Sequence, residues 1–146
     1  PQIMYLDGDR SAAIRDDGFT LYKGSQVPKE VETIKVDKEI VSTFYDDNII
    51  GLVFKNGDKD KPYTMRGYST DGSLKFEKKF NIPYTTIKAS DGNILLYNSS
   101  QISVMNSRGV EKYSGTVDGT ISDFIKTGWN RYLLVLDNGV DVIKLS

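Results

Sequence analysis

Short apolar segments alternate with turns rich in Asp, Asn, Gly and Ser along the whole chain, and residues 90–113 show the pattern most compactly. Ile94–Tyr97 is an unbroken apolar run, Gln101–Met105 alternates between apolar and polar residues, and Val110–Tyr113 is mostly polar. A strand covered on both faces reads as continuous hydrophobic residues, whereas a half-solvated strand alternates. This stretch therefore predicts a small sheet with a buried inner part and a solvated outer edge.

The same pattern recurs along the sequence and predicts strands throughout, with no competing helical period. The expected strands are Ile3–Leu6, Ser11–Arg15, Phe19–Lys23, Val31–Val36, Ile40–Phe44, Ile49–Phe54, Tyr63–Tyr68, Leu74–Lys78, Tyr84–Ala89, Ile94–Tyr97, Gln101–Met105, Val110–Tyr113, Ile121–Lys126, Tyr132–Leu136 and Val140–Leu145. Pro28 argues against pairing in the polar connector Gly24–Glu30, because proline has no N–H to donate.

The spacing of the turns indicates a repeat. The turn between the second and third strands falls at Asp17, near Gly57, at Ser99 and at Asn138, a period of roughly 40 residues that is typical of propeller blades. Second strands are apolar (IIGLVF, ILLY, YLLVL), and fourth strands are striped with charge (VETIKV, LKFEK, VEKYS). We expect an all-β, β-propeller-like fold of about four blades of four antiparallel strands, at residues 1–37, 38–80, 81–115 and 116–146, the last blade one strand short.

A β-sandwich is the alternative, because it also has many short strands with frequent turns. In a sandwich, nothing requires the strands to become less hydrophobic in a repeating cycle of four. The pattern therefore favours the propeller.

Composition excludes several classes of function. The 146 residues suffice for one domain with a real core, 38% are hydrophobic, and the apolar runs are too short to cross a bilayer. A net charge of −1, from 19 basic and 20 acidic residues spread evenly, gives no electrostatic footprint for nucleic acid. Cysteine and histidine are both absent, which excludes thiol nucleophiles, disulfides and a Ser-His-Asp relay.

Because the chain starts at Pro1 and not at Met, we expect a processed or partial product.

Acidic turns raise the question of metal or sugar chemistry. Asp7-Gly8-Asp9, Asp46-Asp47-Asn48 and Asp58-Lys59-Asp60 could offer oxygen ligands to calcium, but none completes a calcium-loop signature, and Asp and Asn are also what tight turns require. We therefore expect no metal and no cofactor. A pair of carboxylates could hydrolyse a glycosidic bond, but solvated surface charge is the more economical explanation of the 20 acids.

Trp129, the only tryptophan, is the best single candidate for a binding site. It stands in the turn Thr127–Arg131, beside Asn130 and Arg131, where an aromatic ring could stack on a sugar or anchor a protein partner. The alternative is that the ring folds back over the sheet edge as packing, as tryptophan often does.

The sequence also resembles a known family. The segments FYDDNIIGLVF (44–54), YTMRGYSTDG (63–72), VMNSRGVEKYSG (104–115) and RYLLVLDNGVDVIKLS (131–146) are similar to those of a bacterial β-propeller family of unknown function, found largely in Firmicutes. The resemblance implies a membrane-anchored protein, with an N-terminal apolar helix followed by a propeller of about seven or eight blades outside the cytoplasm. It implies no catalytic motif.

If the resemblance holds, about four blades would form half a ring, and the terminal blades would expose apolar faces. We expect such an arc to pair with a second copy or with the missing half; a small four-bladed ring is the competing arrangement. The function expected is non-enzymatic recognition of a protein or glycan at the cell envelope, with Trp129, Asn130 and Arg131 in the site. A carbohydrate-active enzyme fragment and a purely structural extracytoplasmic domain are the alternatives.

Overall fold

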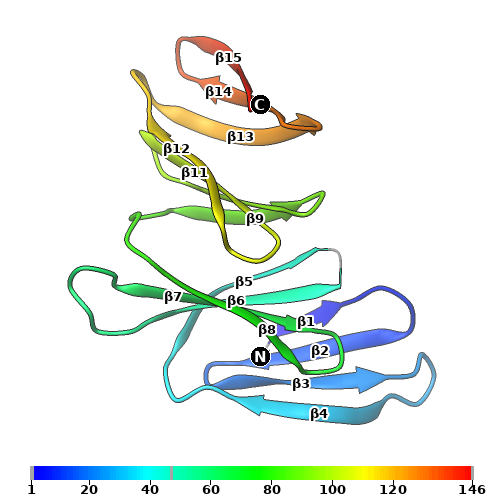
Figure 1. Ribbon diagram of the computed structural model, residues 1–146. Coiled ribbons are helices and arrows are strands. Elements are labelled where there is room, and N and C mark those ends of the chain that lie inside the picture. Colours follow the sequence, from blue (N-terminus) through cyan, green and yellow to red (C-terminus); the bar gives the residue numbers. More distant parts are fainter. Residues whose placement is uncertain (1, 47, 146) are drawn as a thin grey trace. The chain divides into compact units, whose positions relative to one another are not determined.

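The computed structural model describes residues 2–46 and 48–145, which fold into antiparallel strands and turns (Figure 1). The strands are β1 (Gln2–Tyr5), β2 (Arg10–Arg15), β3 (Gly18–Lys23), β4 (Lys29–Lys35), β5 (Ile40–Asp46), β6 (Ile49–Lys55), β7 (Tyr63–Ser69), β8 (Leu74–Phe80), β9 (Thr86–Ser90), β10 (Asn93–Tyr97), β11 (Gln101–Asn106), β12 (Glu111–Thr116), β13 (Ile121–Gly128), β14 (Arg131–Leu136) and β15 (Gly139–Lys144). Among the described residues, no helix is long and apolar enough to cross a membrane.

The strands form four separate sheets, each built from strands that follow one another in sequence (Figure 1). The orders are β1-β2-β3-β4, β5-β6-β7-β8, β9-β10-β11-β12 and β13-β14-β15. All fifteen expected strands are confirmed, as is the missing strand of the last sheet. Four small meandering sheets are not the two large layers of a sandwich, so that alternative is wrong.

One strand boundary differs from the expectation next to Pro28. The connector was expected to extend through Glu30, but β4 begins at Lys29, where Lys29 pairs with Lys23 and Glu30 with Tyr22. Proline prevents pairing only through its own missing N–H, so the strand can start at the next residue.

The chain divides into two compact units, residues 1–81 and 82–146. In the first unit, side chains from the sheets β1–β4 and β5–β8 form one core. Phe19 on β3 and Tyr68 on β7 meet edge to face there, with 5.2 Å between ring centroids. Removing such side chains from water is the main source of stability for sheets this small.

In the second unit, the core is shared by the sheets β9–β12 and β13–β15. Phe124 lies between two aromatic neighbours, 6.0 Å from the ring centroid of Tyr97 and 5.7 Å from that of Tyr132. The buried Tyr132 hydroxyl donates a hydrogen bond to Asn93 Oδ1 over 3.1 Å, which joins the two sheets through a polar contact inside the core.

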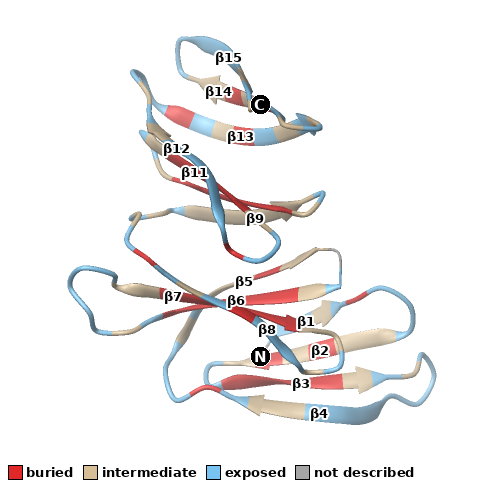
Figure 2. Ribbon diagram, viewed as in Figure 1, coloured by how far each residue is buried: buried red, intermediate tan, exposed pale blue. Residues whose placement is uncertain are grey.

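Burial follows the predicted gradient in the sheets β5–β8 and β9–β12 (Figure 2). The second strands β6 and β10 are buried on both faces, whereas the fourth strands β4 and β12 are mostly exposed. The expectation was wrong for β14, because only Tyr132 and Leu134 are buried there. On the opposite face of that sheet, five aliphatic side chains lie in register and are partly or largely exposed: Ile125, Leu133, Val135, Val140 and Val142.

Candidate functional site

The turn between β13 and β14 consists of Trp129 and Asn130. Gly128 pairs with Arg131, so only two residues connect the strands. Asn130 has a φ of 51°, a left-handed conformation that asparagine tolerates better than most residues. Trp129 is 86% exposed, the largest value among the apolar side chains of the described residues. The alternative that its ring packs over the sheet edge is therefore wrong: the short turn holds the indole beyond the end of the sheet.

Contacts to the neighbouring strands hold the turn in place. The backbone N–H of Leu145 donates to Asn130 O over 2.8 Å, and Lys112 Nζ on β12 donates to Asn130 Oδ1 over 2.9 Å. Within the part of the chain that the structure describes, the indole itself has no hydrogen bond or ring contact. The turn thus presents an exposed aromatic ring on a backbone held by hydrogen bonds.

Positive charge gathers around this turn. Lys112, Lys126, Arg131 and Lys144 come from β12, β13, β14 and β15 respectively. Arg131 and Lys144 are direct cross-strand partners, so their side chains leave the same face of the sheet. Lys126 donates to the backbone oxygen of Asp91 over 3.0 Å, and Lys112 to the Asn130 amide. Both acceptors are neutral, and none of the four cations forms an ion pair with a carboxylate in residues 2–46 and 48–145.

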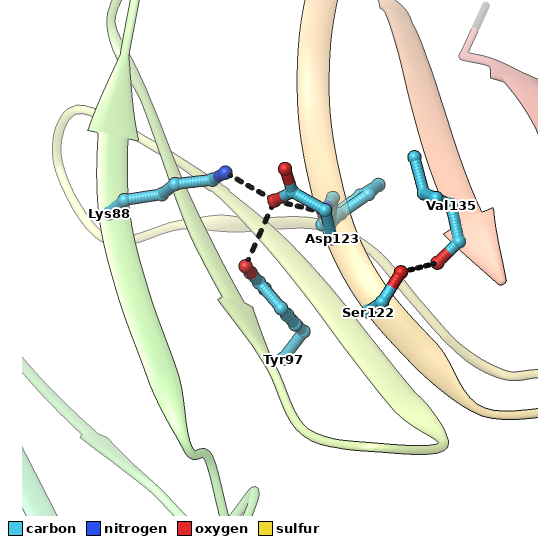
Figure 3. Close-up of polar contacts among 6 residues, drawn as sticks. Lys88, Tyr97, Ser122, Asp123 and Val135 are labelled. Atoms are coloured by element: carbon cyan, nitrogen blue, oxygen red, sulfur yellow. Dashed lines mark hydrogen bonds and ion pairs between the residues drawn. The ribbon is translucent and has the colours of Figure 1, made fainter. Parts of the chain in front are cut away.

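A second polar cluster joins the two sheets of this unit (Figure 3). Asp123 Oδ1 on β13 accepts hydrogen bonds from Lys88 Nζ on β9 over 3.0 Å and from the Tyr97 hydroxyl on β10 over 3.2 Å. The Lys88 ammonium holds the pKa of Asp123 below its usual value, against the opposing effect of partial burial. Asp123 is therefore ionised at neutral pH and cannot act there as a general acid; its contacts are those of a link between sheets.

A groove in the first unit is lined by carboxylates, and their contacts indicate structural roles. This groove of about 300 Å³ is lined by three acids and as many cations, namely Asp37, Asp58, Glu77, Lys38, Arg66 and Lys79, together with Phe54, Asn56 and Thr64. Arg66 Nε binds Glu77 Oε2 at 2.8 Å, and Asp58 Oδ1 accepts a hydrogen bond from the Asp60 backbone. Glu77 thus serves in an ion pair, and Asp58 in the geometry of a turn.

The acidic turns do not assemble a metal site either. Among the described residues, no three His, Cys, Asp or Glu side chains lie close enough to hold a metal ion. Asp47, one member of the turn Asp46-Asp47-Asn48, lies outside the described residues. Asn48 has a φ of 64°, which fits a role in tight-turn geometry.

Residues 1–145 match the model of a family described as a family of unknown function, DUF5711. The chain belongs to the DUF5711 family. Among curated proteins, none matches this DUF5711 chain.

Solved structures similar to this DUF5711 chain include a WD40 β-propeller domain. BamB from Moraxella catarrhalis superimposes with a TM-score of 0.68 at 12% identity, over 98% of this chain and 45% of that one. The WD40 β-propeller domain of Doa1 gives a TM-score of 0.63 at 13% identity, over 98% and 50%. BBS1N in complex with ARL6DN gives 0.62 at 12% identity, over 94% and 47%. The chain spans about half the length of these structures, and at such identities the likeness shows the fold alone, which is propeller-like.

The predicted site residues Trp129, Asn130 and Arg131 are adjacent in the turn and at the start of β14. The sequence analysis missed two residues near the Trp129 turn, Lys112 and Lys144. They lie 17 residues before Trp129 and 15 residues after it. The available signal was the hairpin register: a two-residue turn after Gly128 already places Arg131 near the end of β15. Lys112 could not be found this way, because it belongs to the neighbouring sheet.

Proposed function

We propose that this DUF5711 chain is a non-enzymatic recognition module that uses the Trp129 turn to contact a protein or glycan at the bacterial cell envelope. The observation that carries the proposal is the 86% exposure of Trp129 on a turn held by Lys112 and Leu145. Exposing an indole of this size to water is unfavourable, and tryptophan is enriched among residues that dominate binding energy. A rigid sheet framework that presents a loop residue is a common arrangement for binding sites.

The setting of the module is part of the proposal. We propose that the protein comes from a Firmicute and that a membrane anchor holds it outside the cytoplasm. The sequence resemblance supports both points. The solved neighbour BBS1N was crystallised in complex with ARL6DN, so one protein of similar fold holds a protein partner. The fold is therefore suitable as a recognition scaffold, while the site must be argued from this chain's own residues.

Cosedimentation with purified cell-wall fragments from a Firmicute tests the recognition role. We expect the wild-type chain to pellet with the fragments and Trp129→Ala to remain in the supernatant. Tyr5→Ala is the matched control, because Tyr5 is 82% exposed and lies in the other unit. A Trp129→Ala variant that pellets as well as the wild-type chain would contradict the proposal.

We also propose that a second copy of the chain covers the aliphatic face formed by Ile125, Leu133, Val135, Val140 and Val142. Arg131 and Lys144 stand at the Trp129 end of this face and remain outside the covered part. Val140 and Val142 are 60% and 59% exposed, and an aliphatic face is chemically complementary to a second copy of itself. Two copies would also have about the length of one similar propeller, of which one chain spans 45% to 50%. The division into blades at residues 1–37, 38–80, 81–115 and 116–146 belongs to the same proposal.

Sedimentation velocity tests this pairing. The wild-type chain should dimerise with rising concentration, and Val140→Lys/Val142→Lys should stay monomeric. Lys substitutions at the exposed Val27 and Val110, which lie outside the face, should leave the dimer intact. A wild-type chain that is monomeric at every concentration tested would refute the second copy as occupant.

A further inference from the structure

We infer that the ligand of the Trp129 turn is an acidic glycan, in which the indole stacks on a sugar ring while Arg131, Lys144 and Lys112 bind its negatively charged groups. This inference rests on the proposed recognition role of Trp129 and assigns the chemical class of what is recognised. It depends on the joint placement of one exposed ring and several cations that form no ion pair, which come from the sheet β13–β15 and from β12 of the neighbouring sheet.

The cations are concentrated although the chain as a whole is not basic. The net charge of the protein is −1, yet β12, β14 and β15 bring Lys112, Arg131 and Lys144 to the end of the sheets where Trp129 lies. Lys126 on β13 lies on the opposite face of its sheet from Arg131 and Lys144, because it pairs with Tyr132. Arg131 and Lys144 are directly opposite in register, and like charges in that position destabilise a sheet. A bound anion would remove this repulsion, which makes the pair a suitable place for a carboxylate.

Neutral acceptors position the cations without neutralising them. Lys112 donates to the Asn130 side-chain oxygen at 2.9 Å, and Lys126 to a backbone oxygen at 3.0 Å. Neither contact neutralises the positive charge of the lysine that it positions. The Lys112 contact also ties β12 to the turn and keeps a cation close to the residue next to Trp129.

The surroundings of the indole favour a sugar over a protein surface. Trp129 is flanked by Thr127, Gly128, Asn130 and Arg131, and it has no apolar neighbours in sequence. Protein hot spots lie in desolvated patches surrounded by further contacts that exclude water. A pyranose ring instead offers one apolar face to the indole, and its hydroxyls can bond the polar groups around it.

Affinity electrophoresis in native gels provides the test, with alginate as a polyuronate, dextran as a neutral glycan, and polyglutamate as an acidic polymer without sugar rings. We expect alginate to retard the wild-type chain most strongly and its effect to fade with added salt, since exposed charges are screened within about 8 Å at physiological ionic strength. Trp129→Ala should weaken alginate binding by about tenfold or more, and Arg131→Gln/Lys144→Gln should do the same. Lys59→Gln/Lys61→Gln removes two exposed cations of the other unit and should leave binding unchanged.

Each other outcome counts against the acidic glycan in a recognisable way. Equal retardation by polyglutamate, insensitive to Trp129→Ala, would indicate general attraction to acidic polymers. Retardation by dextran that depends on Trp129 and not on Arg131 or Lys144 would overturn the acidic ligand and leave glycan recognition standing. No retardation by alginate would overturn the inference itself, while the cell-wall experiment with Trp129→Ala decides the recognition role separately.

Discussion

The ring of Phe44 on β5 lies directly over Gly51 on β6, its partner in the sheet register. A Cβ atom added to Gly51 would stand 2.1 Å from Phe44 Cζ, so only glycine fits under the ring. The row continues across the sheet, because Gly51 pairs with Gly67 and Gly67 with Phe76, whose ring occupies the space above Gly67 in the same way. Two phenylalanines thus supply the side-chain packing that two central glycines lack.

Replacing Gly51 by alanine should destabilise the protein. Phe44 would have to leave its position, and overfilling a packed core costs about 1–3 kcal/mol. The control is Gly128→Ala, where an added Cβ meets nothing within 4 Å; its effect should stay within about 0.5 kcal/mol. Urea unfolding monitored by circular dichroism measures both. A Gly51→Ala variant as stable as the wild-type chain would contradict the close contact.

The hydrogen bond between Tyr132 and Asn93 should also contribute measurably to stability. Burial raises the pKa of Tyr132, so the phenol remains a donor at neutral pH, and Tyr132→Phe would leave a buried carbonyl oxygen of Asn93 without it. An unsatisfied buried acceptor costs about 1–3 kcal/mol. Tyr113→Phe is the control, because Tyr113 is 37% exposed. Equal unfolding midpoints for the two variants would show that the contact is not formed.

The link between Lys88 and Asp123 makes a pH-dependent prediction. Because the folded-state pKa of Asp123 is lowered, its contribution is present above the unfolded pKa of about 3.9 and is lost as pH falls through the lower folded value. Asp123→Asn should therefore reduce stability at pH 7, by at most about 1 kcal/mol since the pair is partly exposed. As the pH falls through this range, the difference in stability between the variant and the wild-type chain should shrink.

Urea unfolding midpoints of Asp123→Asn at several pH values measure this effect. The control is Asp118→Asn, at an exposed position in the loop before β13, which should follow the wild-type chain at every pH. A stability difference for Asp123→Asn that is the same at pH 2 and pH 7 would mean that the ion pair is not its cause.

The repeated fall from apolar to charged strands predicted the fold because burial and hydrophobic patterning are tied together along each strand. The segments IIGLVF and ILLY lie in β6 and β10, which are buried on both faces. The segments VETIKV and VEKYS overlap β4 and β12, which are mostly exposed. The pattern misled at YLLVL, since an apolar run does not reveal whether its second face is covered.

The candidate site was only partly predictable. Trp129, Asn130 and Arg131 are adjacent in sequence, so the turn signal was enough to find them. Whether the indole would be exposed depended on a two-residue turn with Asn130 in a left-handed conformation, which the sequence pattern left open. Lys112 reaches the turn from another sheet, and such contacts between sheets leave no trace in local spacing.

Quenching of the fluorescence of Trp129, the only tryptophan, tests the central claim most directly. If the indole is exposed among unpaired cations, iodide should quench it efficiently and caesium poorly, because the local potential attracts anions. Saturating alginate should then protect it from iodide. An indole that iodide cannot reach in the free protein, or one quenched equally with and without alginate, would contradict the account.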